Sequence, residues 1–552
     1  MTVATAKPEV FTRKASGLVR VMSPYSAFVY NILTMGLIFP WTYLWAPGAL
    51  PGGNLFWGIL LATLIEIPIA FTYVWLSTAL PRSGGDYVFQ SRVFGGGWAF
   101  TVVMSGFVIW ILQWVALSGW LVSYLGFAPL FLGLGATLGS ASLSNLGVWF
   151  TTANGIITVS ILNALLSLIL LVSGFKNYVK FQHVMWWGTL IAFAVMFVVL
   201  FATPPDVFVE RLNAFAVASG GAPNFYQTAV EAVTAAGIDL APPFSLMATL
   251  LVAPIAWTSL QWATYSAQQN GEIKDARSFK SQTFIMVGSL VLTGLLLALL
   301  ALGLERVAGT EFLYVAGAGY WSLIPEATVN GFYLWPNIVA VALTGSPIVV
   351  LIIGLGYILN SFQIVCNCYI GMTRVMVAMS LDRLLPAWFS QIHEKWRTPL
   401  NAHLAYFIAS IPVILAYNLV PGWVGLTLGV TFGCGYVFVV SCLAGALLPY
   451  RAKELYEASP GSRYKLGGIP LVTILGIIGG VLGTIMVLAF LFSPTLGVLG
   501  NWNFEAFPSN LWAQIIAFAI ILVSAAWYWL AKSAQKSRGI NVEYAFKEIP
   551  PE

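Results

Sequence analysis

Charged residues are scarce in this sequence. Asp, Glu, Lys and Arg make up 8% of its 552 residues, whereas a soluble domain usually contains about 25%. Hydrophobic residues make up 59% of the chain, and the mean hydropathy is +0.85. So much apolar surface requires lipid around it, because water cannot cover it favourably. The composition therefore excludes a soluble globular protein and predicts one that is embedded in a lipid bilayer.

Cysteine and histidine are also scarce, with four and three residues. All four cysteines fall within hydrophobic runs, and Cys366 and Cys368 are two positions apart, which on a helix directs them to different faces. We therefore expect no disulfide framework, metal site or cofactor. The histidines His183, His393 and His403 lie in or beside polar segments. A hydrolase or transferase in the membrane needs several convergent polar or metal-binding groups, so we expect no enzyme.

Long hydrophobic runs, in contrast, are abundant. Most span about 20 residues, which is enough to cross a hydrocarbon core of about 30 Å as a helix. A transmembrane barrel shows shorter segments with alternating polarity. We therefore predict an all-α polytopic membrane protein with twelve transmembrane helices. Their predicted ranges are 23–46, 55–79, 96–127, 152–174, 182–203, 244–268, 283–304, 346–379, 400–419, 423–448, 470–493 and 511–531.

The positions of Lys and Arg predict the orientation, because these residues favour cytoplasmic loops. With the N-terminus inside, only Arg211 and Arg306 of the 25 Lys and Arg residues lie outside. Both termini are thus predicted to be cytoplasmic, in a protein of the cell membrane. The polar, mildly basic stretch 1–22 is expected to be a cytosolic tail. The net charge of +5 follows from this loop bias, so no nucleic-acid partner is expected.

Two of the predicted spans contain residues that break helices. Thr34, Met35 and Gly36 lie near the middle of the first span, with Pro40 a turn later, and Pro254 lies near the middle of the sixth. Gly and Pro also occur in spans as simple kinks or close-packing points, which is the alternative interpretation of either break alone. The two spans are five apart and so run in opposite directions, as in transporters built from two inverted halves. We therefore predict two five-helix halves joined by an outer loop, followed by two additional helices. The predicted divisions are 1–22 (tail), 23–203 (first half), 204–243 (extracellular loop), 244–448 (second half), 449–531 (helices eleven and twelve) and 532–552 (tail).

Outside the membrane, the composition of residues 224–238 predicts a short surface helix. It lies in the outer loop that joins the two halves. A packed extracellular loop is one interpretation of this segment, and a lid or gate is the other.

Glu66 lies midway along the second span, near Pro68. A charged group at mid-span costs on the order of 3 kcal/mol or more, so it is a functional candidate. One interpretation is a carboxylate that carries a proton or coordinates a cation. Another is an acceptor for backbone N–H groups that a neighbouring broken helix leaves free. A lipid-facing position without a role is the third.

Uncharged polar residues gather in the third, sixth and eighth spans. Gln113 lies between Trp110 and Trp114, which suits an apolar cavity with a few hydrogen bonds or ordinary aromatic packing. The other members are Thr258, Ser259, Gln261, Asn360, Ser361, Gln363 and Asn367. Broken helix ends offer N–H groups for a carboxylate and C=O groups for an ammonium or Na⁺, an arrangement that fits a zwitterion.

Three polar segments show a family resemblance. Residues 79–87, Ala-Leu-Pro-Arg-Ser-Gly-Gly-Asp-Tyr, closely resemble the Pro-Arg-Ser-Gly-Gly-Asp/Glu-Tyr signature of the amino acid-polyamine-organocation (APC) permeases. Residues 271–277, Gly-Glu-Ile-Lys-Asp-Ala-Arg, resemble the Glu-Ile/Val-Lys-Asn-Pro-Arg stretch of that family. The third segment begins at the end of the eighth span. In it, Arg374 resembles an Arg of that family, residues 378–386 resemble its Ala-Met-Ala-Arg-Asp-Gly-Leu-Pro element, and residues 397–399 resemble its Thr-Pro element.

This resemblance implies the five-plus-five inverted repeat of sodium-coupled neurotransmitter transporters (the LeuT-like fold), with substrate held by the broken first and sixth helices. For substrate binding, the resemblance implies residues of the two broken helices, and the third span adds the candidates described above. Together the predicted binding residues are Thr34, Met35, Gly36, Trp110, Gln113, Trp114, Ala253, Pro254, Ile255, Ala256, Trp257 and Thr258. Trp257 lies near a gating aromatic of the family, and Thr34-Met35-Gly36 replaces its Gly-Ser/Ala-Gly triplet. Near the position where some members place a Lys, this chain has Gly188 and Thr189. The coupling or gating candidates are Glu66, Arg82, Asp86, Thr189, Asn360 and Ser361.

The predicted function is that of a secondary active transporter, an amino acid permease of the cell membrane. Its expected substrates are neutral or hydrophobic amino acids, with symport of H⁺ or Na⁺, or antiport, left open. A permease of the same fold for polyamines or other organic solutes is the alternative. A channel or a transport-incompetent nutrient receptor is the alternative of another class. The expected partners are the solute, a coupling ion and the lipid bilayer, and the oligomeric state is open.

Overall fold

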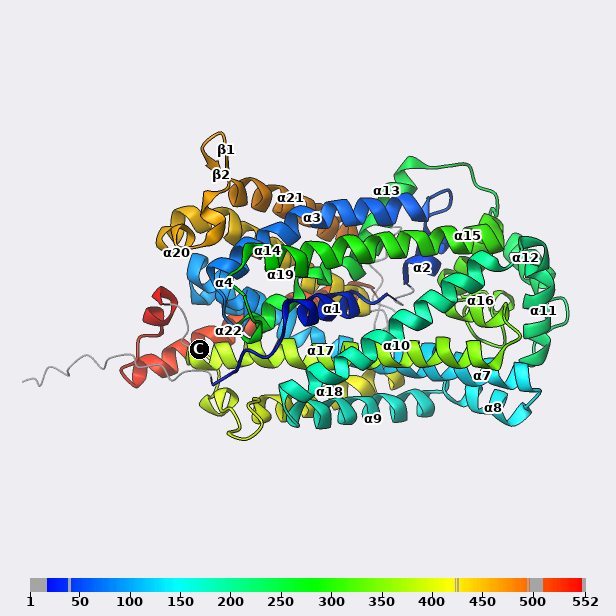
Figure 1. Ribbon diagram of the computed structural model, residues 1–552, viewed down its shortest axis with the longest axis horizontal. Coiled ribbons are helices and arrows are strands. Elements are labelled where there is room, and N and C mark those ends of the chain that lie inside the picture. Colours follow the sequence, from blue (N-terminus) through cyan, green and yellow to red (C-terminus); the bar gives the residue numbers. More distant parts are fainter. Residues whose placement is uncertain are drawn as a thin grey trace, which may run out of the picture.

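The computed structural model describes residues 17–37, 41–421, 423, 426–493, 496 and 510–548. They form an elongated bundle in which the long helices run roughly along the longest axis of the molecule (Figure 1). Within this part of the chain, eleven helices are long and apolar enough to cross a membrane. The expected all-α polytopic membrane fold is thus confirmed. The spanning segments are Leu55–Ala79, Gly96–Leu138, Ala153–Val172, Phe175–Ala202, Leu246–Glu272, Phe279–Trp321, Pro347–Leu381, Leu400–Leu419, Cys434–Arg451, Leu471–Phe492 and Ile515–Ser537.

The first predicted span accounts for the difference between eleven and twelve. It is divided into α1 (Pro24–Met35) and α2 (Trp41–Ala49), and each is shorter than a membrane-crossing helix. Ser23 caps α1 by accepting a hydrogen bond from the backbone N–H of Ser26 at 3.0 Å. Gly36, with a φ of 77°, ends it, because a residue without a Cβ adopts this conformation at little cost. Pro40 lies outside the described residues, and the count of twelve stays a prediction.

The remaining spans fall close to their predicted ranges. The second and ninth are α3 (Leu55–Ala79) and α18 (Leu400–Leu419), with the ends that the sequence predicts. The third span is longer than expected and continues through five consecutive helical segments. They are α5 (Gly96–Val103), η1 (Met104–Ile109), α6 (Ile111–Trp120), η2 (Leu121–Phe127) and α7 (Ala128–Leu138), of which η1 and η2 are π-helical.

The seventh span also exceeds its prediction. It runs through α14 (Phe279–Thr283), η5 (Phe284–Gly288) and α15 (Ser289–Trp321). The predicted end was residue 304, just before Glu305 and Arg306, but α15 continues past them and leaves helical geometry at Gly309, with a φ of 79°. The other long helices are α9 (Ala153–Val172), α10 (Phe175–Ala202), α13 (Leu246–Leu260) with η4 (Gln261–Glu272), α17 (Pro347–Leu381), α19 (Leu426–Arg451), α21 (Leu471–Phe492) and α22 (Asn510–Ser537).

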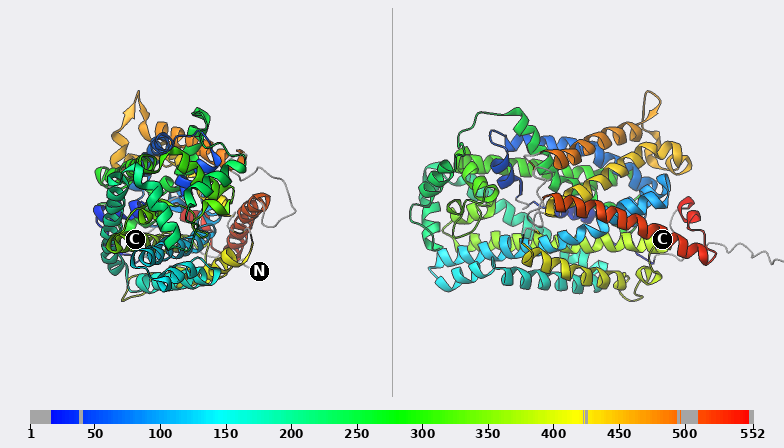
Figure 2. Two further views of the ribbon diagram at one scale, coloured as in Figure 1. Left: turned by 90° about the vertical axis from the view of Figure 1, so that its right-hand side faces the viewer. Right: turned by 180° about the vertical axis from the view of Figure 1, so that it is seen from behind.

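Short elements gather at the two ends of the bundle (Figures 1 and 2). One end carries α8 (Ala141–Trp149), η3 (Pro205–Val207), α11 (Phe208–Ala218), α12 (Phe225–Ala235), η6 (Pro325–Ala327) and α16 (Pro336–Ala342). Of these, α12 confirms the surface helix predicted over 224–238. The opposite end carries the predicted cytoplasmic segments. They form α4 (Gly85–Phe94), η7 (Ala387–Ser390), α20 (Lys453–Glu457), η9 (Pro460–Arg463), the hairpin β1 (Lys465–Leu466) and β2 (Ile469–Pro470), and η11 (Val542–Lys547).

Small residues allow the long helices to approach closely, as is usual between helices in lipid. A Cβ on Gly356 of α17 would lie 2.1 Å from the Cβ of Ala192 on α10. Likewise, a Cβ on Gly58 of α3 would lie 2.4 Å from the Cβ of Val252 on α13. These contacts bring α10 to α17 and α3 to α13. The division into inverted halves and additional helices stays a prediction.

Candidate binding site between two broken helices

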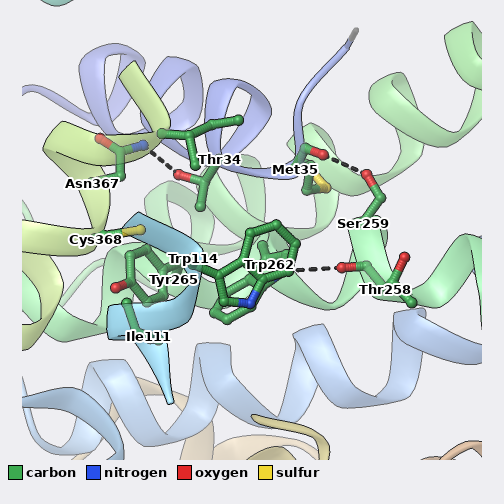
Figure 3. A pocket seen from close by; sticks show the side chains of 11 residues that line it. Thr34, Met35, Ile111, Trp114, Thr258, Ser259, Trp262, Tyr265, Asn367 and Cys368 are labelled. Carbon is green, nitrogen blue, oxygen red and sulfur yellow. Dashed lines mark hydrogen bonds between the residues drawn. The ribbon is translucent and has the colours of Figure 1, made fainter. Parts of the chain in front are cut away.

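The end of α1 is held by side chains from two other helices. Thr34 Oγ1 donates to the carbonyl of Tyr30 at 2.6 Å and accepts a hydrogen bond from Asn367 Nδ2 on α17, also at 2.6 Å. The next carbonyl, that of Met35, accepts a hydrogen bond from Ser259 Oγ on α13 (Figure 3). Since the helix stops at Gly36, its last carbonyl groups lack the partners that a further turn would supply. The break predicted at residues 34–36 is therefore present.

The break in α13 comes later than predicted. The sequence indicated Pro254, but the α-helix continues through this residue to Leu260. One missing N–H and a local adjustment are tolerated in a membrane helix that neighbouring helices support. The tighter 3₁₀ geometry begins at Gln261, where the sequence turns from apolar to polar, and Gln269 leaves helical geometry altogether. Trp262 Nε1 donates to the carbonyl of Thr258 at 2.9 Å across this change.

A cavity lies between the two breaks (Figure 3). Its volume is about 20 Å³, which is the room that one water molecule needs, so the cavity is contracted in this conformation. The lining residues are Thr34, Met35, Ile111, Trp114, Thr258, Ser259, Trp262, Tyr265, Ile364, Asn367 and Cys368. None carries a charge, and most are apolar or aromatic. The site thus suits a small solute with an apolar part and a few hydrogen-bonding groups.

Aromatic side chains shape one wall of the cavity. The Trp262 ring lies edge-on to Trp114, with 5.7 Å between the ring centroids, and edge-on to Tyr265 at 5.3 Å. The hydroxyl of Tyr265 is buried and has no hydrogen-bond partner among the described residues. A buried polar group without a partner is costly. The hydroxyl packs against Gly371 of α17, and Tyr265 is a candidate hydrogen-bond partner for a bound solute.

The structure brings together only part of the predicted binding set. Thr34, Met35, Trp114 and Thr258 line the cavity. The predicted residues outside its lining are Gly36, Trp110, Gln113, Ala253, Pro254, Ile255, Ala256 and Trp257. The later break in α13 explains why five of these residues, 253–257, do not line the cavity, because it shifts the lining of α13 and η4 to residues 258–265. Whether the lining residues bind a solute stays a prediction.

Sequence reasoning did not select Ile111, Trp262, Tyr265 or Ile364. For Trp262 and Tyr265 a signal was present, since the polar run that begins at Gln261 marks the true change of helix geometry. Ile111 and Ile364 carried no signal, because they resemble any apolar residue of a span. Gln113 has another partner, since its Oε1 accepts a hydrogen bond from Trp423 Nε1 at 2.9 Å.

Glu66 is fully buried on α3 and contacts α13 beside the cavity. Its Oε2 accepts a hydrogen bond from Trp257 Nε1 at 2.6 Å, and its Oε1 has no partner among the described residues. The donor is an indole side chain, whereas one interpretation of the sequence expected a backbone N–H group at a broken helix. Trp257 thus points toward α3, away from the cavity that Thr258 and Ser259 line.

The other coupling candidates lie on helices next to the α1 break. Asn360 Nδ2 donates to the carbonyl of Leu33 at 3.0 Å, which joins α17 to the last turn of α1. Thr189 Oγ1 lies 3.5 Å from the carbonyl of Gly356 and joins α10 to α17. Ser361 is buried on α17. These contacts are structural links, and a role in coupling stays a prediction.

Asp86 anchors a buried network near the predicted cytoplasmic end. Its carboxylate accepts hydrogen bonds from Ser441 Oγ at 2.5 Å, from Tyr73 and from Gln268. Burial raises the pKa of Asp86, and these three hydrogen bonds oppose part of that rise. Arg82 is the other coupling or gating candidate of this segment. Arg82 is half-buried and donates to the carbonyl of Pro81 at 3.1 Å.

Two buried ion pairs involve residues of the segments that carry the family resemblance. Arg374 on α17 and Glu272 at the end of η4 meet in a two-pronged contact, with N–O distances of 2.7 and 3.0 Å. Asp382 accepts hydrogen bonds from Tyr87 at 2.8 Å and from Arg92 at 2.9 Å. Segments far apart in the sequence therefore meet at this end of the bundle.

Comparison with known proteins agrees with this architecture. A family model described as amino acid permease matches residues 25–525. The Branched-chain amino acid permease BcaP of Bacillus subtilis (strain 168) is 32% identical over 127 residues, which cover 23% of this chain and 25% of that protein. Uncharacterized protein 399 of Sulfolobus islandicus rod-shaped virus 1 is 31% identical over 83 residues, which cover 15% of this chain and 21% of that protein. The chain thus spans a quarter or less of the length of these relatives.

Proposed function

Since this chain belongs to the amino acid permease family, we propose that it is a secondary active transporter that moves amino acids across the plasma membrane by alternating access. The observation that carries this proposal is the uncharged cavity between the broken helices α1 and α13. Broken helices that meet at a cavity leave backbone groups free to bind both ends of a zwitterion without a buried Arg or Lys.

The substrates we propose are neutral, hydrophobic amino acids. Ile111, Trp262 and Ile364 supply apolar surface, and the lining contains no acidic residue. A polyamine carries several ammonium groups and would need carboxylates in the cavity to replace their hydration. The similarity of one segment to a branched-chain amino acid permease favours the same substrate class.

The proposed transport cycle opens one end of the bundle at a time. The Arg374–Glu272 and Arg92–Asp382 ion pairs close the predicted cytoplasmic end. Glu272 ends η4, the continuation of α13, so a movement of α13 that opens this end has to separate Glu272 from Arg374. With both termini inside the cell, as the charge pattern predicts, the two ion pairs support a state closed toward the cytoplasm.

Thermal unfolding of the purified protein with a panel of solutes tests the substrate class, because a ligand that binds the folded state raises Tm. We expect leucine-like amino acids to raise Tm and polyamines to have no effect. Ile364→Trp should abolish this shift by filling the cavity. Ile408→Trp is the matched control, since Ile408 is an exposed residue of α18 and should keep the shift. Stabilisation by polyamines alone would contradict the proposal.

A further inference from the structure

The carboxyl group of Glu66 is enclosed at the interface of α3 and α13 and takes no part in lining the cavity. Its exposed fraction is 0%. The only hydrogen bond found for it within the described residues is the one from Trp257 Nε1 to Oε2, at 2.6 Å, and Oε1 is buried without a partner. An acid in such a position is unusual, because ionisable groups in spans are costly and normally paired.

None of the ion pairs found in the described part of the chain includes Glu66. The neighbouring helices α2, α13 and α21 contain no Asp, Glu, Lys, Arg or His. The charged residue of α19 is Arg451 at its C-terminal end, and its guanidinium group lies over the ring of Phe94, 5.8 Å from the centroid. Among the described residues, no positive charge therefore pairs with Glu66 in this conformation.

The charged residues of the other packed elements are directed elsewhere. On α15, Arg306 donates to the carbonyls of Leu200 and Thr203 on the outer side of the bundle, and Glu305 lines a separate pocket next to the start of α3. At the opposite end, the exposed Lys280 lies on α14. The remaining charged groups there are Glu272, which is paired with Arg374, and Arg463, which contacts Tyr464.

One indole N–H cannot replace the hydration shell of a carboxylate, whereas a neutral acid needs far less. The enclosed position of Glu66 therefore suits the neutral acid better than the carboxylate. Ionisation would require water or further donors, which the packed interface of α3 and α13 does not supply. The charge of Glu66 and the contact between these helices are thus linked.

Trp257 connects this interface to the cavity. The next two residues along α13, Thr258 and Ser259, line the cavity, and Ser259 bonds to the end of α1. The Trp257 ring also packs against Phe438 of α19 at 6.5 Å. A movement of α13 away from α3 therefore changes the cavity and exposes Glu66 together.

We propose that Glu66 is the proton-binding group of an H⁺-coupled cycle, neutral while α13 packs against α3 and ionised after α13 moves and water enters. This inference rests on the proposed transport function and adds the coupling ion to it. A proton fits better than Na⁺, because hard cations take several oxygen ligands, and the partner of Glu66 is an N–H donor.

Accumulation of labelled leucine by proteoliposomes with an acidic outside buffer tests the proposal. A gradient of one pH unit can support about tenfold accumulation if one proton moves with each solute. We expect the wild type to accumulate leucine, and Glu66→Gln to reach only the outside concentration while it retains counterflow without a gradient. Glu231→Gln, at an exposed residue of α12, is the control and should accumulate leucine like the wild type.

The results separate this inference from the function on which it rests. Full accumulation by Glu66→Gln would overturn the proton role, and so would accumulation driven by Na⁺ alone. Absence of wild-type counterflow would overturn the proposed function itself. If Glu66→Gln does not fold, Trp257→Phe provides the second test. Loss of a donor that favours the ionised form should move the pH of half-maximal uptake upward, and an unchanged profile would overturn the proposal.

Discussion

The Nε atom of Arg374 lies 2.7 Å from Oε2 of Glu272, and both side chains are 1% exposed. Glu272 terminates the polar continuation of α13, whereas Arg374 lies in the last third of α17. The same guanidinium group lies 3.2 Å from His403 Nε2 and over the ring of Phe175. Four separate elements therefore meet at one buried charge.

Arg374→Ala should destabilise the protein strongly. Removal of one member of a buried ion pair leaves an uncompensated charge and typically costs about 3–5 kcal/mol. The combined variant Arg374→Ala with Glu272→Gln should recover part of this loss, because neither charge then remains alone. Thermal or denaturant unfolding in detergent measures both effects.

The exposed pair Lys453–Glu457, with side chains that are 71% and 61% exposed, is the matched control. Lys453→Ala should change stability by less than about 1 kcal/mol, as is usual for exposed pairs. Strictly additive effects of the Arg374 and Glu272 substitutions would argue against the buried pair.

Tyr265→Phe should weaken substrate binding without unfolding the protein. The hydroxyl of Tyr265 has no partner among the described residues, so its removal costs no internal hydrogen bond. Loss of one hydrogen bond to the solute, about 1 kcal/mol, should raise the KM for transport roughly fivefold. Tyr369→Phe is the control, since Tyr369 bonds to Ser410 and lies outside the cavity lining. Equal KM values in the wild type and Tyr265→Phe would exclude this role.

Asp86 should make stability depend on pH. Because burial raises its pKa above the ordinary value of 3.8, the folded protein binds this proton more tightly than the unfolded chain. The stabilising contribution is full below pH 3.8 and is lost as pH rises through the raised pKa. The Tm of the wild type minus that of Asp86→Asn should therefore fall as pH increases across this window. A difference that stays constant or grows with pH would contradict the assignment.

Gly356→Ala should loosen the contact of α10 with α17. The added Cβ would lie 2.1 Å from the Cβ of Ala192, and overpacking of this kind typically costs about 1–3 kcal/mol. Gly345→Ala is the control, because a Cβ there meets nothing within 4 Å. Unfolding of the two variants under the same conditions measures the difference. Equal Tm values would mean that the helices pack less closely than the structure indicates.

The sequence predicts most of the spanning helices because hydrophobic length is decided locally. The ends of α3 and α18 agree with prediction, since polar residues border each apolar run. The predicted length of α15 was too short, because Glu305 and Arg306 are tolerated near the end of a spanning helix. Arg306 donates hydrogen bonds there to the carbonyl groups of Leu200 on α10 and of Thr203, which directly follows α10.

The candidate site was less predictable, because it depends on tertiary contacts. The break after Met35 was evident from Gly36, but the break in α13 was assigned to Pro254 instead of the polar run from Gln261. The Trp257–Glu66 hydrogen bond joins residues 191 positions apart. Neither residue indicates the other in the sequence, and only the packing of α3 against α13 brings them together.

Counterflow tests the proposed transport function most directly. Proteoliposomes are loaded with unlabelled leucine, diluted into a trace of labelled leucine without an ion gradient, and sampled over time. An alternating-access transporter should concentrate the label transiently inside, with a rate that saturates as leucine rises and that is lost in Ile364→Trp. Binding of leucine to the purified protein without any entry of label would show a receptor and would contradict the proposed function.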